Sequence, residues 1–241
     1  MFKTFRYRLL VLLPFSALCT GAEQGCSSVS LCNQAGSAAY QAGQYAVAID
    51  AFERQLRGAE IADDTPQREL ALNNLMLANL KAGKPGMARA WLEVALEADL
   101  DGPATRHNLA KVGAVDVQTL SATPEGQYLR YAGQAAWSSL EITRVADGNY
   151  RAELSPIRAG RGTLEEWGPA AIGELAGELK GSGAYFSLHS ADLGQGCAVD
   201  LLRDGLRLRV LEVFADGCQD YGGANISVAG RYYKVAGKNQ P

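Results

Sequence analysis

The feature that most constrains the fold is a pair of helical segments joined by a glycine, at residues 39–56. Their sequence is AYQAGQYAVAIDAFERQL, in which Tyr45, Ala48 and Phe52 follow Gly43 at three- and four-residue steps. Residues spaced in this way share one face of a helix. Gly43 suits the turn because glycine readily takes the left-handed conformation that ends a helix. The segment therefore predicts a helical hairpin held together by small and aromatic side chains.

The same pattern returns forty residues later. Gly83 ends a second predicted helix, and Ala88 and Leu92 follow it at the distances at which Ala48 and Phe52 follow the first turn. A pattern that recurs at a fixed period indicates a repeated structural unit. The sequence therefore predicts two copies of one helical hairpin.

Residues 58–64, between the two copies, are predicted to form a loop. Thr65 and Pro66 then predict the start of the next helix, because threonine is a favoured capping residue and proline is common at the first helical position. Residues 103–112 predict one further helix that opens like a third copy but has no partner. Two repeats and a capping helix lie near the lower limit for a continuous stacked core.

Residues 32–112 resemble tetratricopeptide (TPR) repeats, on the evidence of the turn glycines and the alanines that follow them. In that family the first helices of successive units line a concave groove that binds other proteins. The resemblance implies a protein-interaction scaffold. Alignment of the copies assigns seven residues to the groove: Asn33, Ser37, Tyr40, Asn73, Leu77, Leu80 and His107.

Two interpretations of the polar groove residues remain open. Asn33, Asn73 and His107 occupy equivalent places in three successive copies. They either hydrogen-bond the backbone of a bound peptide or are ordinary solvated residues of a helix surface. Trp91 lies on a second helix, where packing in the core or between repeats is favoured over a role in ligand binding.

From residue 127 the periodicity changes from helical to the two-residue period of strands. Leu140 and Ile142 alternate with polar neighbours, Asp147 and Gly148 predict a tight turn, and residues 150–154 alternate again. Similar runs occur at residues 184–190, 197–203, 206–213 and 225–235. Five or six strands joined by short turns predict an antiparallel meander, closed or nearly closed as a small barrel. The predicted fold class is therefore α+β.

The first 22 residues are predicted to be a signal peptide. Lys3, Arg6 and Arg8 precede an apolar stretch at residues 9–18, and Ala22 provides the small residue at the expected cleavage site. The apolar stretch is about half the roughly 20 residues that a membrane-spanning helix needs. An uncleaved anchor is one alternative, and a lipid anchor through Cys19 is another.

The composition shift and the breaks in periodicity divide the chain into five parts. We expect no integral membrane segment after cleavage. The predicted parts are a signal peptide at 1–22, a helical repeat domain at 23–112, a linker at 113–126, an antiparallel barrel at 127–236 and a tail at 237–241.

Four cysteines remain after the predicted cleavage, and an even number in an exported chain predicts disulfides. We expect Cys26 to pair with Cys32 and Cys197 with Cys218, because this pairing keeps each bridge within one predicted domain. The chain has no Cys-x-x-Cys pair and only two histidines. A metal site is therefore not predicted.

The segment CQDYGGANISVAGRYY, residues 218–233, resembles the ending of small β-barrel domains of bacterial envelope proteins that include lysozyme inhibitors. The resemblance rests on a cysteine, a glycine turn and a Gly-x-Tyr ending. It implies a barrel that blocks the cleft of a basic enzyme with a loop and acidic or polar groups. No residue is assigned to such a loop.

Charge and motif content exclude several function classes. Cleavage after Ala22 moves the net charge from −3 to about −6, which disfavours nucleic acid as a partner and favours a basic protein. Gly222 and Gly223 are not followed by a phosphate-binding helix, and no Gly-x-Ser-x-Gly motif is present. Glu165 and Glu166 are the remaining carboxylate candidates for acid–base chemistry. No catalytic residue or cofactor is predicted.

The sequence thus predicts an exported, non-catalytic adaptor, periplasmic or secreted. Its groove and barrel are expected to bind another envelope protein or a cell-wall component. The alternative is an inhibitor of a secreted cell-wall hydrolase such as lysozyme, with the barrel as the inhibitory part. A third class, an enzyme that acts on cell-wall material near Glu165 and Glu166, requires paired carboxylates in a cleft.

Overall fold

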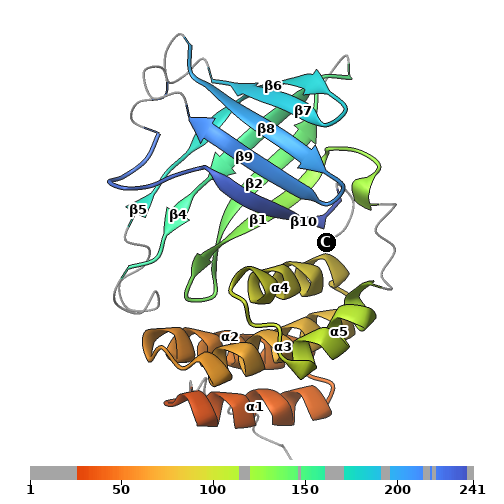
Figure 1. Ribbon diagram of the computed structural model, residues 1–241, viewed down its shortest axis with the longest axis vertical. Coiled ribbons are helices and arrows are strands. Elements are labelled where there is room, and N and C mark those ends of the chain that lie inside the picture. The colour runs from red at the N-terminus through yellow and green to blue at the C-terminus, as the bar shows by residue number, and fades with distance from the viewer. Residues whose placement is uncertain are drawn as a thin grey trace, which may run out of the picture.

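In the computed structural model, the N-terminal part of the chain forms a layer of helices and the C-terminal part forms a closed antiparallel β-barrel (Figure 1). This arrangement confirms the predicted α+β class. The described residues are 26–113, 120–145, 148–160, 171–190, 196–213, 218 and 221–237. The predicted signal peptide, including Cys19, and the carboxylates Glu165 and Glu166 lie outside them.

Five helices in the described part of the chain pack as antiparallel neighbours in sequence order. They run below the barrel in Figure 1, with α4 next to the barrel and α1 farthest from it. Their bounds are α1 (Val29–Gln41), α2 (Tyr45–Ile61), α3 (Thr65–Lys81), α4 (Pro85–Glu97) and α5 (Pro103–Gly113).

All four turns between these helices use one backbone arrangement. In the first turn the amide of Gln44 donates to the carbonyl of Ala39 at 2.9 Å, and the other three turns have an equivalent bond. This pattern is the Schellman motif, which requires a left-handed residue after the helix. That residue has a φ of 74° at Gly43, 53° at Asp63, 73° at Gly83 and 56° at Asp99.

The predicted loop at residues 58–64 is wrong, because α2 continues to Ile61. Gly58 is part of the helix, where a Cβ would lie only 2.9 Å from the Val29 side chain of α1. Gly36 of α1 has the same role, because a Cβ there would lie 2.5 Å from the ring of Phe52. Both glycines therefore allow α1 and α2 to pack closely.

The barrel is closed by eight strands in the order β1-β10-β9-β8-β7-β6-β3-β2. The predicted count of five or six strands is too low, because β1 and β6 were not recognised. The strands are β1 (Gly126–Gly133), β2 (Ala136–Arg144), β3 (Tyr150–Ser155), β6 (Leu175–Ser182), β7 (Tyr185–His189), β8 (Ala198–Asp204), β9 (Arg207–Val213) and β10 (Gly230–Ala236). Two short strands, β4 (Ile157–Arg158) and β5 (Ala171–Ile172), pair separately.

The pairing confirms the predicted hairpin of β2 and β3, in which Leu140 lies opposite Leu154 and Ile142 opposite Ala152. The expected strand at 225–235 begins later, at Gly230. Asn225 has a left-handed φ of 56°, which is incompatible with a strand at that residue.

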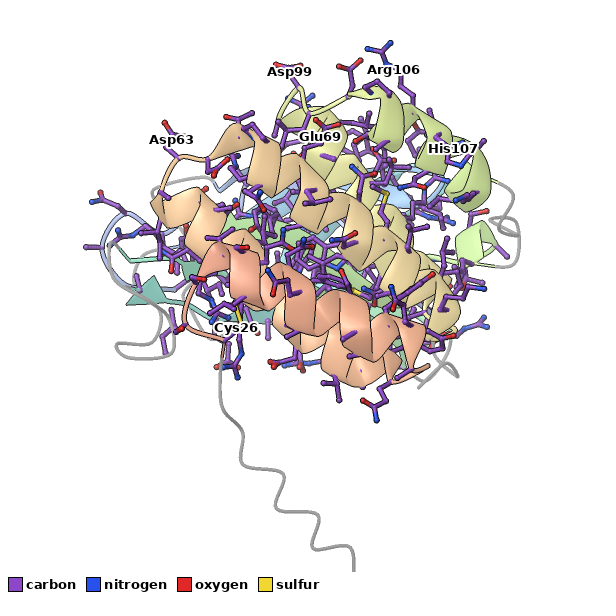
Figure 2. All side chains as sticks on the ribbon, turned by 90° about the horizontal axis from the view of Figure 1, so that it is seen from below. Cys26, Asp63, Glu69, Asp99, Arg106 and His107 are labelled. Atoms are coloured by element: carbon purple, nitrogen blue, oxygen red, sulfur yellow. A yellow bond between two sulfur atoms is a disulfide. The ribbon has the colours of Figure 1, made fainter. Side chains whose placement is uncertain are left out.

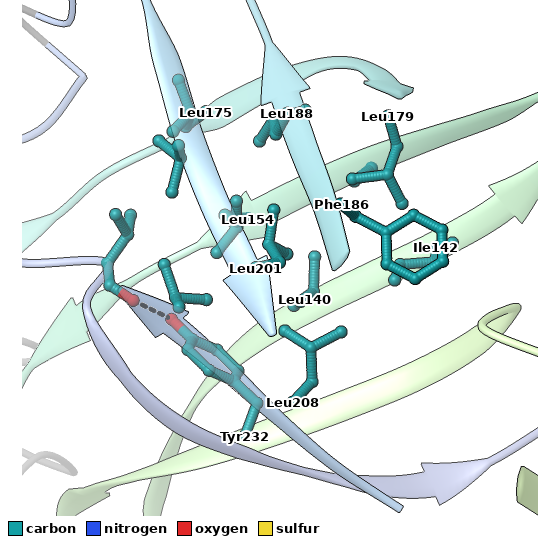
Figure 3. Close-up of a cluster of buried hydrophobic side chains, with 14 of the residues drawn as sticks. Leu140, Ile142, Leu154, Leu175, Leu179, Phe186, Leu188, Leu201, Leu208 and Tyr232 are labelled. Carbon is teal, nitrogen blue, oxygen red and sulfur yellow. Dashed lines mark hydrogen bonds between the residues drawn. The ribbon is translucent and has the colours of Figure 1, made fainter. Parts of the chain in front are cut away.

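The interior of the barrel is filled with side chains. Leucine, isoleucine and phenylalanine side chains from six strands meet there, and the hydroxyl of Tyr232 donates to the carbonyl of Val228 at 3.0 Å (Figure 3). These residues are at most 3% exposed. Small eight-stranded barrels commonly have such a core rather than a ligand cavity.

One end of the barrel holds residues 120–125, part of the predicted linker. Lys234 Nζ donates to the carbonyl oxygen of Thr123 at 2.7 Å. The hydroxyl of Tyr128 donates to the carbonyl oxygen of Pro124, also at 2.7 Å. Arg203 donates to the carbonyl of Ser121. Burial, together with the positive charge of Arg203, lowers the pKa of Lys234 to about 8. These contacts fix the segment that enters β1.

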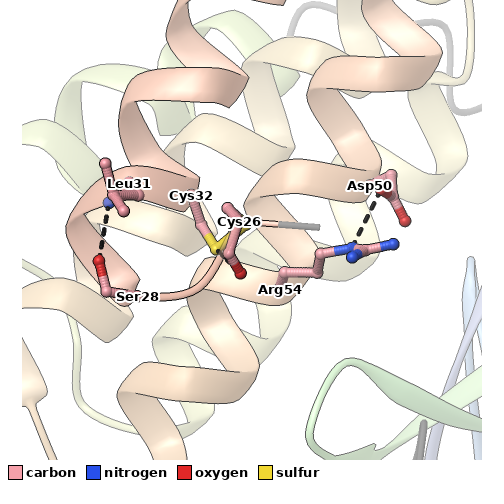
Figure 4. The surroundings of a disulfide bond; sticks show 6 residues. All are labelled: Cys26, Ser28, Leu31, Cys32, Asp50 and Arg54. Atoms are coloured by element: carbon pink, nitrogen blue, oxygen red, sulfur yellow. Dashed lines mark hydrogen bonds and ion pairs between the residues drawn. A yellow bond between two sulfur atoms is a disulfide. The ribbon is translucent and has the colours of Figure 1, made fainter. Parts of the chain in front are cut away.

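Both predicted disulfides are present. Cys26 is bonded to Cys32 at the start of α1, where Ser28 caps the helix by accepting from the amide of Leu31 at 3.3 Å (Figure 4). Cys197 is bonded to Cys218 in the barrel, and both are buried. Two disulfides indicate an oxidising location outside the cytoplasm.

None of the described helices is both long enough and apolar enough to cross a membrane. The described residues also contain no group of three or more histidine, cysteine or acidic side chains placed to hold a metal ion.

Glu53 of α2 gives a pH-dependent prediction. Burial, together with the nearby charge of Asp50, raises the pKa of Glu53 to about 7. Between pH 4.5 and 7 the Glu53 carboxyl is therefore ionised in the unfolded chain but still protonated in the folded chain. Its contribution to stability falls as pH rises, by at most about 1.4 kcal/mol per pH unit. Glu53→Gln cannot ionise and is expected to be more stable than wild type at pH 8.

Thermal unfolding followed by circular dichroism between pH 4 and pH 8 checks this prediction. The midpoint of Glu53→Gln minus that of wild type is expected to grow with pH. A difference that stays constant over this range would contradict the role assigned to Glu53.

Candidate functional site

A small pocket lies between the first and third helices, and we name it the α1–α3 pocket. Its volume is about 140 Å³, and its lining mixes aromatic and aliphatic side chains with amides and a hydroxyl. The lining residues are Ser37, Tyr40, Gln41, Phe52, Asn74 and Leu77.

Helical spacing explains why these residues converge. Ser37, Tyr40 and Gln41 are three and four residues apart on α1 and so share one face. Asn74 and Leu77 are three apart on α3. The ring of Tyr40 also packs edge-on against Tyr45, with ring centroids 5.6 Å apart, which restrains the phenol at the edge of the pocket.

Three of the seven predicted groove residues line the α1–α3 pocket, namely Ser37, Tyr40 and Leu77. Sequence reasoning missed Gln41, Phe52 and Asn74. Gln41 and Asn74 could have been predicted from helical spacing, because each lies one helical turn from an assigned residue. Phe52 was assigned only to the hairpin core.

Asn33 lies beside the pocket and is bonded to the chain itself. Its side-chain oxygen accepts from Asn74 Nδ2 at 3.0 Å, so the two amides join α1 to α3. Asn33 is only partly buried. Asn74, rather than Asn73, is thus the residue of α3 that faces it.

Asn73 is 4% exposed and is bonded within the chain. Its side-chain nitrogen donates to Thr105 Oγ1 at 2.9 Å, and its oxygen accepts from Asn108 Nδ2 at 2.7 Å. These bonds join α3 to α5. Asn73 therefore presents no free polar group to a peptide in this conformation.

The two remaining groove residues lie apart from the α1–α3 pocket. His107 is exposed on α5, and Figure 2 shows it at the edge of the helical layer. Leu80 is partly buried and packs against the helical core. The predicted row of Asn33, Asn73 and His107 therefore does not form one polar surface.

The barrel packs against α4, which belongs to the second predicted hairpin. Trp91 of α4 is completely buried and meets Trp137 and Tyr131 of the β1–β2 hairpin, with ring centroids 4.6 Å and 5.7 Å away. Trp91 is therefore a core residue, as expected, and it belongs to the core between the helices and the barrel. Gly86 of α4 contributes by leaving room for the backbone of β10 at Val235.

Three glutamates of the helices add polar contacts to this junction. Glu60 Oε1 accepts from the hydroxyl of Tyr131 at 2.8 Å. Both carboxylate oxygens of Glu93 accept from Arg207 at 2.9 Å, and Glu97 pairs with Arg231 at 3.0 Å. Burial raises the pKa of Tyr131 well above its usual value, and the charge of Glu60 raises it further. The helices and the barrel thus form one continuous packed unit.

This junction leaves the α1–α3 pocket free of the barrel. All six lining residues belong to α1, α2 or α3. The barrel instead contacts α4 and the end of α2. The later half of the chain therefore contributes nothing to the lining of the pocket.

Comparisons with family models, with curated proteins and with solved structures gave no match. The TPR and lysozyme-inhibitor resemblances therefore stay predictions.

Proposed function

We propose that this protein is an exported, non-catalytic binding protein that holds a segment of another envelope protein in the α1–α3 pocket. The observation that carries the proposal is the mixed lining of that pocket, contributed by three successive helices. The helices act as TPR-like repeats in this proposal. The barrel serves as a rigid support joined to α4.

The size of the pocket supports a peptide rather than a small-molecule ligand. Sites for drug-sized ligands have volumes of about 300–1,000 Å³. The α1–α3 pocket has about 140 Å³ and suits one apolar side chain between Tyr40, Phe52 and Leu77. Gln41, Asn74 and Ser37 carry donors and acceptors at its edge for the peptide backbone on either side of that anchor.

The two disulfides support a site of action in the periplasm or outside the cell. The predicted signal peptide at residues 1–22 agrees with export, and a lipid anchor through Cys19 is the alternative attachment. The partner in this proposal is an envelope protein with an accessible apolar segment. A nucleic-acid partner is disfavoured by the acidic net charge.

A peptide-display screen against the intact protein tests the proposal. We expect enrichment of peptides that share one large apolar residue. The best peptide is then titrated by fluorescence anisotropy into wild type and Ser37→Trp, whose indole fills the pocket from α1. Ser37→Trp is expected to weaken binding at least tenfold, which is about 1.4 kcal/mol.

Ala38→Trp is the matched control, because Ala38 is the exposed neighbour of Ser37 on the same helix. It adds the same indole outside the pocket and is expected to retain wild-type affinity. Equal affinity of wild type and Ser37→Trp would refute the assignment of the pocket. A screen that enriches no peptide would refute the proposed function.

Inhibition of a lysozyme-like hydrolase stays a sequence-based prediction. Arg207, Arg209 and Arg231 line the described outer face of β9 and β10. This face has the same charge sign as a basic enzyme and so does not favour docking there. An assay of lysozyme activity with micromolar intact protein checks the alternative, and an unchanged rate would exclude it.

A further inference from the structure

A second hollow lies on the outside of the barrel, across β8, β9 and β10, and we name it the arginine cleft. Its volume is about 670 Å³. Figure 1 shows these three strands side by side on the face of the barrel above α4. Three outward arginines belong to the lining, which consists of Leu202, Asp204, Arg207, Arg209, Val210, Leu211, Ala229, Gly230 and Arg231.

The strand register places two of these arginines directly opposite each other. Arg231 of β10 is paired with Arg209 of β9, and Arg209 is paired with Leu202 of β8 on its other side. Like charges that face each other across antiparallel strands repel. This arrangement is therefore costly unless a negative group lies between or beside them.

Among the described residues, carboxylates bind two of the three arginines. Arg207 binds both oxygens of Glu93, and Arg231 uses its Nε to bind Glu97. Asp204 lies opposite Arg207 in the pairing of β8 with β9. Within the part of the chain that the structure describes, the side chain of Arg209 forms no hydrogen bond or ion pair. Arg209 thus brings positive charge to the cleft that no described carboxylate neutralises by direct contact.

We propose that the arginine cleft binds the carboxylate or phosphate group of a sugar-sized anion between Arg209 and Arg231. Guanidinium groups bind both oxyanions through paired N–H donors. Because Arg231 contacts Glu97 through Nε, its terminal nitrogens are available on the other edge of the same plane. The volume lies in the range of small-molecule sites, and Leu202 and Leu211 offer apolar surface to the body of the ligand.

This site is separate from the α1–α3 pocket and does not rest on the proposed peptide binding. The pocket is lined by α1, α2 and α3, whereas the cleft is lined only by residues 202–231 of the barrel half. The cleft would give the protein a second ligand, which is negatively charged rather than basic.

Isothermal titration of the intact protein at low salt tests the proposal. The probes are glucose 6-phosphate and glucuronate, which carry a phosphate and a carboxylate on sugars of similar size, with glucose as the neutral reference. We expect saturable binding of at least one of the two anions and none of glucose. Which anion binds more tightly identifies the oxyanion that the cleft prefers.

The variant Arg209→Gln is expected to weaken this binding about tenfold. Arg209 is exposed, and its loss removes a like-charge pair, so the variant is expected to fold as well as wild type. Arg151→Gln is the control, because Arg151 is an exposed arginine of β3, on the opposite side of the barrel from β9. It removes the same charge and is expected to retain wild-type affinity.

Three results would overturn the proposal. The first is that neither glucose 6-phosphate nor glucuronate shows saturable binding. The second is equal binding of glucose. The third is an affinity that Arg209→Gln leaves unchanged, or that both variants lower equally.

Discussion

Replacing Trp91 with alanine is expected to lower the free energy of unfolding by about 3–5 kcal/mol, the usual range for a large aromatic residue removed from a core. Trp91 is completely buried and contacts both Tyr131 and Trp137. Its loss opens a cavity between α4 and the β1–β2 hairpin.

Calorimetry and circular dichroism measure the effect of Trp91→Ala. The unfolding midpoint is expected to fall by about 6–20 °C, from the usual change of 2–4 °C per kcal/mol for a chain of this size. The transition is also expected to separate into helical and barrel components, because the residue joins the two. A loss below about 1 kcal/mol would contradict the packing described.

Leu109→Ala is the control for Trp91→Ala. Leu109 lies on α5 and is 45% exposed. Substitutions at such exposed positions usually change stability by less than about 0.5 kcal/mol. The comparison therefore separates the loss of the junction from a general effect of shortening an apolar side chain.

The second large effect is expected from the barrel disulfide. The double variant Cys197→Ala/Cys218→Ala is expected to lose about 3 kcal/mol, because the bridge closes a long loop in the unfolded chain. The two cysteines are 21 residues apart in the sequence, and their side chains belong to the barrel core. The bridge therefore restricts the conformations of the unfolded chain, and in the folded protein it packs in the barrel core.

Cys26→Ala/Cys32→Ala is the matched comparison, because these cysteines are only 6 residues apart. The loop-closure argument gives this pair about 2 kcal/mol. Denaturant unfolding of both variants, and of wild type with and without reductant, measures the two contributions. A larger loss from the N-terminal pair than from the barrel pair would rule out the loop-length explanation.

Local sequence patterns predicted most of the helices and the hairpin of β2 and β3, because one face of each element is apolar. They failed at β1, where Tyr128 and Leu129 are both buried although they point to opposite faces. Tyr128 packs inside the barrel, whereas Leu129 lies in the cluster between the barrel and α4 with Tyr233 and Ala90. The covering helix thus removes the alternation by which a half-buried strand is recognised.

The missed strand β6 has a different cause. Its sequence, LAGELKGS, contains Gly177 and Gly181, which are uncommon inside strands. Gly177 is required because the backbone of His189 in β7 lies where a Cβ would be. The glycine therefore marks a close approach between strands, and it also weakens the sequence pattern by which a strand is recognised.

The candidate pocket was predicted in part. Alignment of the copies assigned Ser37, Tyr40 and Leu77 to one groove, and these three residues line one pocket; their role in binding stays a prediction. The assignment of Asn73 depended on the exact rotation of α3 against α5. The structure turns Asn73 toward Thr105 and Asn108 and presents Asn74 to α1.

The sequence by itself determined the helical hairpins, the change to strands after residue 126 and the pairing of the four cysteines. The hairpins and the strands follow from periodicity along the chain, and the cysteine pairing follows from keeping each bridge within one predicted domain. Only the tertiary structure decided that α4 covers β10 and that Arg209 faces Arg231. The physical reason is that periodicity reports which face of an element is apolar, whereas the element that covers this face comes from a distant part of the chain.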